Sequence, residues 1–368
     1  MDILIISQHI YPMQTPRAHR TMELAAELSR QGHSVTLYAI LGDYDYTTIS
    51  KDLKITIKSI PTYFQVSSFS SDGYKKRTLV DQILTKFLGK LIEFPDIEFY
   101  FSIPRIVYNE KQYDAIISIA NPHPIHWGTA RAKRKFPAKF PKTWIADCGD
   151  PYMKNGKSNK KQKWFNSFEK RFCNSADFIT VPVQNAIEFY FCEYLPKIKV
   201  IPQGFNFDLP IQREHVSCAI PTFLFAGTFI KVMRDPRPFL KFLRSLKIDF
   251  KFIIYTSHTD LIKNEIRLLG DKVEVHEYID RASLIKIMKR VSFLINIENL
   301  GADGQTPSKL IDYAIAGRPI LSIKPEKLDE KLILEFLSGD YRRETKMHQV
   351  EDYHIKKIAN SFTDLLSK

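Results

Sequence analysis

Cysteine is scarce in this chain, and the cysteines present are not paired. Cys148, Cys173, Cys192 and Cys218 are widely spaced among 368 residues and form no C-x-x-C motif. That spacing argues against a disulfide framework and against a zinc ribbon, because both need cysteines at short, regular intervals. We therefore expect ordinary buried or half-buried thiols.

Long hydrophobic runs are missing as well. No stretch approaches the roughly 18 consecutive apolar residues of a membrane span, although 44% of the residues are hydrophobic. The N-terminal sequence MDILIIS lacks the basic head and the small-residue cleavage site of a signal peptide, and it has the pattern of a buried strand. We therefore expect a globular, cytoplasmic protein, and a length of 368 residues suggests two domains.

Acidic residues are outnumbered by basic ones. The chain has 54 Lys and Arg against 41 Asp and Glu, which gives a formal net charge of +13. Such an excess favours phosphate-bearing partners, whether nucleotides, nucleic acids or an anionic membrane surface. Much of it lies in residues 75–77, 131–142 and 154–163. Because nucleic-acid motifs are absent and aromatic residues are not interleaved with these runs, we expect no nucleic-acid partner. Peripheral contact of the basic N-terminal half with the inner face of an anionic membrane stays open.

Strand-like and helix-like segments alternate along the chain. An apolar run at residues 3–6, a helical pattern at 17–30 and a second apolar run at 35–41 form a βαβ unit, which predicts a parallel sheet. Further strands are expected at residues 115–119, 143–146, 178–181, 199–201, 223–226, 250–255, 273–275, 293–297 and 320–322. The predicted fold class is α/β, with Rossmann-like domains at residues 1–205 and 206–345. A helical segment at residues 346–368 follows and is able to pack on either half, the N-terminal domain included.

Glycine is absent from the first loop in which a nucleotide site would be sought. In parallel α/β sheets, ligands bind at the carboxyl ends of the strands, and the loop at residues 7–17 follows the first strand. A dinucleotide fingerprint needs glycine there for a tight turn and for close approach of the backbone to pyrophosphate. An NAD site in the N-terminal half is therefore disfavoured.

A loop late in the second half has the features that the first loop lacks. Thr306 suits a helix N-cap and Pro307 the first helical turn. A helix that begins there offers its backbone N–H groups and its dipole to an anion, with Ser308 and Lys309 beside it. One turn later, the carboxylate of Asp312 is in place to accept hydrogen bonds from ribose hydroxyls.

The loop after residues 223–226 brings further cations. Lys231 and Arg234 come just before Asp235 and Pro236, which suit an N-cap and a first helical position. Two cations beside two helix N-termini suit a nucleoside diphosphate and need no metal ion to neutralise it. The alternative, in which these are capped helices of an ordinary sheet, stays open at this point.

Carboxylates and histidines elsewhere give weaker signals. Asp43 and Asp45 match the spacing of a metal-binding D-x-D motif, but acidic residues are common in turns. His123 and His126 have no obvious third zinc ligand, so we expect no metal site. His9, at the end of the first strand, suits the wall of an acceptor site or an ordinary loop.

Asp147 and Asp150 end a later predicted strand. Either carboxylate suits a base that acts on an acceptor hydroxyl, and either also suits a cap on the turn that follows.

Several short motifs occur in an order that resembles GT-B glycosyltransferases of family 4, above all the bacterial members that build surface polysaccharides. They span nearly the whole chain. The residues that carry the resemblance are Arg20 with Leu24 and Ala25, residues 30–36 (RQGHSVT), 120–124 (ANPHP), 147–152 (DCGDPY), 201–206 (IPQGFN), 227–236 (GTFIKVMRDP) and 307–319 (PSKLIDYAIAGRP).

The resemblance implies a GT-B fold, in which two Rossmann-like domains face each other across a cleft. It implies a retaining transfer from a UDP- or GDP-type nucleotide-sugar to a glycan or lipid-diphosphate-linked acceptor, with no obligatory metal or cofactor. By position it implies catalytic roles for His123, Lys231 and Arg234. The donor-binding residues that it implies are Gly227, Thr228, Ile279, Thr306, Ser308, Lys309, Leu310 and Asp312. The acceptor-side residues that it implies are His9, Arg20, Asp147 and Asp150.

Some positions depart from the family's pattern. Asp312 and Gly304 stand where glutamates are usual, Gly149 replaces an arginine and Gln203 replaces an asparagine. A nucleotide-sugar epimerase or hydrolase on the same fold is the nearest alternative enzyme, although the acid–base pair that it needs at the sugar carbon is not evident. A non-catalytic nucleotide- or membrane-binding module is the alternative from another class, and Gly304 is its main support.

Overall fold

The computed structural model divides the chain into two units. Unit 1 comprises residues 1–206 and 352–368, and unit 2 comprises residues 207–351. The sequence-based boundaries lie at 205/206 and 345/346. The structure describes residues 1–13, 15–64, 69–70, 73–74, 79–149, 151–153, 163–211, 213, 216, 218–299, 308–347 and 349–367.

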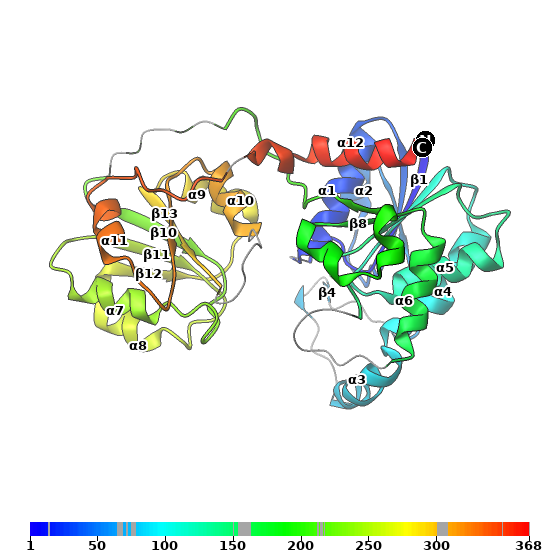
Figure 1. Cartoon of the computed structure of the whole chain (residues 1–368), viewed down its shortest axis with the longest axis horizontal. Helices are drawn as coiled ribbons and strands as arrows, with labels where there is room; N and C mark the ends of the chain where they lie inside the picture. The colour runs from blue at the N-terminus through cyan, green and yellow to red at the C-terminus, as the bar shows by residue number, and fades with distance from the viewer. Residues whose placement is uncertain are drawn as a thin grey trace. The chain divides into compact units, whose positions relative to one another are not determined.

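Unit 1 is built on a parallel seven-stranded sheet (Figure 1). The strand order is β3-β2-β1-β6-β7-β8-β9, with β1 paired in register to both β2 and β6. Each central strand is an almost wholly buried apolar run, as expected of a sheet that is covered on both faces. The strands are β1 (Asp2–Ser7), β2 (Ser34–Ala39), β3 (Thr56–Ser59), β6 (Ala115–Ile119), β7 (Thr143–Asp147), β8 (Phe178–Val181) and β9 (Ile198–Val200).

Helices cover both faces of this sheet. On one face, α1 (Pro16–Arg30) and α12 (Ile355–Leu366) pack on alternate side chains of the strands, such as Ile3 and Ile5. On the other, α4 (Phe99–Asn109), α5 (Pro124–Lys135) and α6 (Phe165–Ser175) pack on Leu4 and Ile6. The period of two in a strand sends successive side chains to opposite faces, so each face has a core of its own.

Helix α1 begins and ends where its sequence predicts. The Thr15 side chain accepts a hydrogen bond from the N–H of Ala18 at 3.2 Å, and Pro16 occupies the first turn. Beyond the last turn, Gly32 adopts φ +86°, a conformation that glycine reaches at low cost. The helix predicted at residues 17–30 is confirmed.

The C-terminal helix belongs to unit 1. The N–H of Phe205 donates to the carbonyl of Tyr353 at 2.8 Å, and the N–H of Ile355 donates to the carbonyl of Phe205 at 2.9 Å. From there α12 packs against α1, where the guanidinium of Arg20 lies 5.2 Å from the centre of the Phe362 ring. Gly204 makes this close approach feasible, because an added Cβ would come within 2.6 Å of Ile355.

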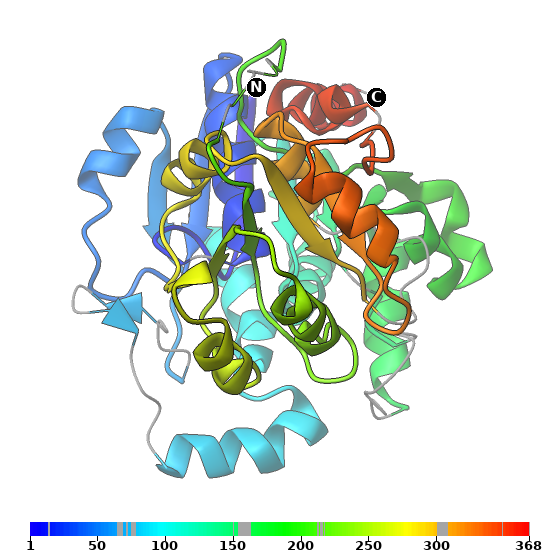
Figure 2. The same ribbon diagram turned by 90° about the vertical axis from the view of Figure 1, so that its left-hand side faces the viewer.

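Unit 2 has a parallel five-stranded sheet in the order β12-β11-β10-β13-β14. Helices α7, α8 and α11 share a core with one face, and α9 and α10 share a core with the other. Figure 2 shows unit 2 with α7 and α11 nearest the viewer. The elements are β10 (Thr222–Ala226), α7 (Arg237–Ser245), β11 (Lys251–Tyr255), α8 (Lys263–Leu269), β12 (Val273–His276), α9 (Arg281–Met288), β13 (Phe293–Ile297), α10 (Ser308–Ile315), β14 (Ile320–Ile323) and α11 (Glu330–Leu337).

The α/β fold class with two parallel sheets is confirmed. Strands β6, β8 and β13 have the predicted bounds, and the other predicted strands differ at their ends by one or two residues, whereas β3, β4 and β5 were not predicted. Among the described residues, no helix is both long and apolar enough to cross a membrane. The remaining elements are α2 (Thr47–Leu53), β4 (Phe69–Ser70), β5 (Gly73–Tyr74), α3 (Leu79–Ile92) and 3₁₀ turns at Asp96–Glu98, Gln184–Phe189, Cys192–Lys197, Gly270–Lys272 and Val350–Tyr353.

Candidate functional site

The order of strands in unit 2 reverses between β10 and β13. Chain connections run outward from β10 toward β12 on one side and outward from β13 toward β14 on the other. The loops that leave the carboxyl ends of these two strands diverge at that point, which is where open α/β sheets bind ligands. Residues 227–236 and the start of α10 flank it. The predicted donor residue Thr306 lies outside the described residues, as does the side chain of Ser308.

Arg234 is held at this edge by neutral groups. Its Nε donates to Oδ1 of Asn299 at 2.8 Å and its Nη1 donates to the carbonyl of Thr228 at 3.1 Å. Two backbone hydrogen bonds to Ile230 fix the turn that presents it. The side chain is half-buried, and this burial lowers the pKa of Arg234. Since arginine stays protonated in proteins, the burial leaves a desolvated cation.

Lys309, in the first turn of α10, is the second cation. Its Nζ lies 3.4 Å from the carbonyl oxygen of Ile297 and 4.9 Å from the centre of the Phe225 ring. Burial of the ammonium group, together with repulsion by Arg234, lowers the pKa of Lys309 to about 7. Among the described residues, no carboxylate lies within ion-pair distance of Arg234 or Lys309. The pair is therefore a concentration of positive charge without a protein counter-ion in that part of the chain.

The surroundings of the two cations are partly polar and partly aromatic. The hydroxyls of Thr228 and Tyr278 lie 3.3 Å apart, and Tyr278 is half exposed. The N–H of Ala226 donates to the hydroxyl of the buried Tyr313 at 3.0 Å, which anchors α10 to the end of β10. Gly227 follows directly with φ +145°, which side-chain-bearing residues rarely adopt.

Other predicted donor residues are placed differently. Lys231 is exposed in the loop after β10, and Ile279 is exposed beside Tyr278. Leu310 packs against the core on the α9–α10 face. Asp312 forms an ion pair with Arg281, whose Nε and Nη2 lie 2.7 and 2.6 Å from its Oδ1.

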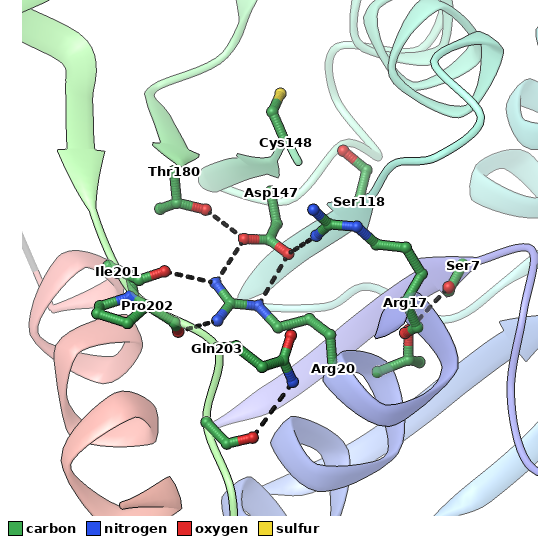
Figure 3. A network of polar contacts seen from close by, with 12 residues as sticks. Ser7, Arg17, Arg20, Ser118, Asp147, Cys148, Thr180, Ile201, Pro202 and Gln203 are labelled. Atoms are coloured by element: carbon green, nitrogen blue, oxygen red, sulfur yellow. Dashed lines mark hydrogen bonds and ion pairs between the residues drawn. The ribbon is translucent and has the colours of Figure 1, made fainter. Parts of the chain in front are cut away.

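The acceptor-side prediction for unit 1 concerns a buried ion pair (Figure 3). Arg20 Nη2 lies 2.7 Å from Oδ1 of Asp147, and Arg20 Nε donates to its Oδ2 at 3.1 Å. The side chains are 3% and 0% exposed. Thr180 donates to Oδ1 at 2.6 Å, and Arg20 also donates to the carbonyls of Ile201 and Pro202. Burial raises the pKa of Asp147, but attraction to Arg20 outweighs it and holds the pKa below its ordinary value.

A second guanidinium lies beside this pair. Arg17 Nη1 is 3.5 Å from Oδ2 of Asp147, and a Cβ added at Gly149 would lie 1.9 Å from Arg17 Nη2. The missing side chain at position 149 therefore leaves the space that the Arg17 guanidinium fills. Asp150 lies outside the described residues.

His123 lies at the N-cap of α5 and is 7% exposed, with its ring centre 5.1 Å from Tyr152 and 5.7 Å from His126. His126 is fully buried, with Nδ1 2.8 Å from Ser118 Oγ and Nε2 3.3 Å from Cys148 Sγ. Burial lowers the pKa of His126 well below its ordinary value, so its ring is neutral. His126 thus belongs to a hydrogen-bonded interior, and the His123 ring packs beside it.

The loop after β1 borders an open groove of about 330 Å³. His9 lies in this loop, and burial lowers its pKa. Helices α1 and α2 form the remainder of the groove. It is lined by Tyr11, Met13, Ala18, His19, Met22, Glu23, Ile49, Asp52 and Leu53.

Sequence reasoning missed Asn299 and Arg281. Asn299 follows the end of β13, so the rule that ligands bind at strand ends was enough to include it. Arg281 comes directly after Asp280, which caps α9 by accepting from the N–H of Ser283 at 2.9 Å. A capped helix start next to the predicted donor-binding residue Ile279 was therefore a usable signal.

Comparison with known proteins gives one family and a set of similar folds. The model of Glycosyltransferase Family 4 matches residues 18–209. The structure resembles a glycosyltransferase from Rickettsia africae, with TM-score 0.67 and 12% identity over 100% of this chain and 98% of that one. It also resembles HepE of Anabaena in complex with UDP and glucose, with TM-score 0.63 and 11% identity over 100% of both chains. A further similar structure is the lipopolysaccharide outer core galactosyltransferase WaaB, with TM-score 0.61 and 12% identity over 100% of this chain and 99% of that one. At such identities the likeness shows the fold, and the GT-B fold predicted is confirmed. No curated protein sequence matches the chain.

Proposed function

The chain belongs to glycosyltransferase family 4, and from this premise we propose that it moves a sugar from a nucleotide-sugar to a glycan or lipid-diphosphate-linked acceptor. The transfer retains the anomeric configuration and serves bacterial surface polysaccharide synthesis. The observation that carries the proposal is the pair Arg234 and Lys309, two desolvated cations at the strand-order reversal of unit 2 with neutral protein partners.

The chemistry of the donor explains why such a pair is useful. Breaking the bond between sugar and nucleoside diphosphate leaves negative charge on the phosphate oxygens. Fixed cations in a desolvated site stabilise that charge without having to reorganise. In this proposal Arg234 and Lys309 contact the diphosphate, Lys231 adds charge from the same loop, and Gly227, Thr228 and the backbone at the start of α10 lie against the donor.

The rest of the donor falls on neighbouring elements. Asp312 takes the ribose, and Ile279 and Leu310 border the base. A uracil base is favoured because HepE, which has a similar fold, was solved with UDP and glucose. The protein residues supply the whole of the charge neutralisation, so the donor needs no metal ion.

We assign the acceptor to unit 1. The groove of about 330 Å³ that the loop after β1 borders has an exposed tyrosine, Tyr11, and two carboxylates, Glu23 and Asp52. Aromatic faces stack on sugar rings and carboxylates accept hydrogen bonds from sugar hydroxyls. His123, at the end of β6, borders the reacting sugar, while the Arg20–Asp147 pair fixes the strands beside it. Replacing Tyr11 by Ala should raise the KM for a glycan acceptor and leave the KM for the donor unchanged; equal changes in both would contradict this assignment.

Unit 1 also offers a surface for an anionic membrane. Phe87 of α3 is 73% exposed, Phe101 of α4 is 53% exposed and Trp164 is 50% exposed. Trp164 Nε1 donates to the carbonyl of Leu91 at 3.2 Å, and the guanidinium of Arg131 lies 4.9 Å from the centre of the Phe101 ring. Aromatic side chains next to cations suit the headgroup layer. Co-sedimentation with phosphatidylglycerol vesicles should fall for Phe87→Ser; equal sedimentation with pure phosphatidylcholine would argue against the surface.

The donor proposal is tested by ligand-induced stabilisation of the folded chain. A panel of nucleoside diphosphates and their sugars should raise the melting temperature with one base only, equally with and without Mg²⁺ or Mn²⁺. Arg234→Met and Lys309→Met should each raise the dissociation constant for the nucleoside diphosphate roughly 10- to 100-fold, the effect of a lost charge-assisted hydrogen bond. Lys263→Met, an exposed lysine of unit 2 paired with Asp260, is the matched control.

Three results would count against this reading. A shift that depends strictly on the metal would direct attention to Asp43 and Asp45. The absence of any shift would favour a non-catalytic module. Binding with release of free sugar, and no transfer to an acceptor, would favour a hydrolase.

A further inference from the structure

The carboxylate expected to meet the donor ribose is held by an arginine of the neighbouring helix. Nε and Nη2 of Arg281 lie 2.7 and 2.6 Å from the same oxygen, Oδ1 of Asp312. Both side chains are 22% exposed, so the pair lies at the boundary between protein and solvent. These two contacts restrict the rotation of the Asp312 carboxylate.

The backbone that supplies Arg281 is itself fixed. Arg281 is the first residue of α9, and the side chain of the preceding Asp280 accepts the N–H of Ser283 at 2.9 Å. Helix α9 packs against α10, and Met288 of α9 and Tyr313 of α10 belong to one core. An arginine that projects from a capped helix start has a limited choice of positions for its planar guanidinium.

The position of Asp312 relative to Lys309 matters as well. The two residues are three apart on α10, and residues at this spacing lie on the same side of a helix. A ribose is joined directly to the diphosphate in a nucleotide, so a carboxylate one turn beyond the phosphate-facing cation is where the ribose hydroxyls fall. An aspartate is shorter than a glutamate by one methylene, and its reach depends more strongly on how its carboxylate is oriented.

We propose that Arg281 is a positioning residue that orients the Asp312 carboxylate toward the ribose hydroxyls of the donor. The inference rests on the proposed function and deepens it, because it names the part of the nucleotide that the Arg281–Asp312 pair distinguishes. Arg281 acts through Asp312 and selects ribonucleotides over deoxyribonucleotides.

The test compares UDP with 2′-deoxy-UDP by titration calorimetry on the full chain. The wild-type chain should bind UDP about tenfold more tightly, the effect of one hydrogen bond to a charged group. Asp312→Asn and Arg281→Gln should each bring the ratio of the two dissociation constants close to one. Arg281→Lys should restore part of it. Lys286→Gln, an exposed change on the same helix, should leave the ratio as it is.

The outcomes separate this inference from the proposed function. If Arg281→Gln weakens UDP and 2′-deoxy-UDP equally, the ratio is unchanged and Arg281 only holds two helices together. If the wild-type chain binds both nucleotides equally well, the donor site stands and the positioning role is overturned. If it binds neither these nor GDP and 2′-deoxy-GDP, the proposed function fails and this inference fails with it.

Discussion

Two arginines, buried Arg20 in unit 1 and half-buried Arg234 in unit 2, have opposite electrostatic surroundings. Arg20 in unit 1 meets both oxygens of Asp147 and two backbone carbonyls, and it is 3% exposed. Arg234 in unit 2 donates to the amide oxygen of Asn299 and to the carbonyl of Thr228. A second cation, Lys309, lies close enough that the charge of Arg234 adds to the effect of burial in lowering the pKa of Lys309. The first charge is balanced by the fold, and the second is not balanced by the described residues.

The difference teaches which of the two is structural. A buried ion pair whose hydrogen bonds are complete contributes to the fold, since removing one partner strands the other charge in a low-dielectric interior. Two desolvated cations side by side weaken the fold, because each opposes the charged form of the other. A pair of cations that destabilises the fold in this way is typical of a functional site, because groups with perturbed pKa values cluster where ligands bind.

The largest expected effect on stability is that of Arg20→Met. The substitution leaves the carboxylate of Asp147, which is 0% exposed, without its principal cation. We expect the free energy of unfolding to fall by about 3–5 kcal/mol, as for other buried pairs that lose one partner. Urea unfolding of the two proteins measures the difference.

The matched control is Lys170→Met. Lys170 is 46% exposed and pairs with Glu193, which is 51% exposed, so its loss should cost less than about 1 kcal/mol. If both variants lose the same small amount of stability, Asp147 does not depend on Arg20 and the contrast between the two units disappears.

A smaller effect is expected from Lys309→Met, and its sign depends on pH. The folded-state pKa of Lys309, about 7, lies below the ordinary value of 10.5, so between these values the unfolded chain holds a proton that the folded chain has released. Stability of the wild type therefore rises with pH from about 7 upward, by at most about 1.4 kcal/mol per pH unit. The Met variant should lack this rise.

The measurement is urea unfolding at pH 7, 8 and 9. The curves of stability against pH should converge as the pH increases, with the variant the more stable protein at pH 7. Curves that stay parallel would show that Lys309 keeps an ordinary pKa in the fold, and the cation pair would lose its significance as a strained site.

The fold was accessible to sequence reasoning because its signals are local. Continuous apolar runs such as Ala115–Ile119 and Phe293–Ile297 have few alternatives to a buried parallel strand, and both were predicted at their observed bounds. Thr15, Pro16 and Gly32 mark the ends of α1 by conformational preferences that need no tertiary contact. The strand-end rule then selected the loops that hold Thr228, Arg234 and Lys309.

The partners of the site residues were not accessible in the same way. Arg20 and Asp147 are 127 residues apart, and Arg281 and Asp312 are 31 apart. Which arginine meets which carboxylate depends on the order of strands and on packing between helices, and neither is encoded in the residues that flank them. His123 illustrates the same limit: its motif places it at the end of a strand, but only the packing of Tyr152 and His126 around it determines that it is nearly buried.

The smallest effect is expected from Gly149→Ala, which separates Arg17 from Arg20 within unit 1. A Cβ at position 149 would lie 1.9 Å from Nη2 and 2.8 Å from Cζ of Arg17, so the guanidinium must move. These atoms are the end of a flexible side chain, and Gly149 has no positive φ that would strain an alanine. Asp147 keeps Arg20 and Thr180, so the free energy of unfolding should change by less than about 1 kcal/mol. Alanine also lowers the conformational entropy of the unfolded chain, which offsets part of the cost of moving the Arg17 guanidinium.

Gly204→Ala provides the contrast for this prediction. Its Cβ would come within 2.6 Å of Ile355 Cδ1 and 3.2 Å of Ile358 Cβ, and both isoleucines are buried in the core, which leaves their side chains little room to move. Overpacking of this kind costs about 1–3 kcal/mol. If Gly149→Ala destabilised the chain as much as Gly204→Ala does, Arg17 would belong with Arg20 among the groups that hold unit 1 together. A small loss at position 149 instead leaves Arg20 alone as the structural counterpart of Arg234, and the balanced charge of unit 1 then rests on a single guanidinium.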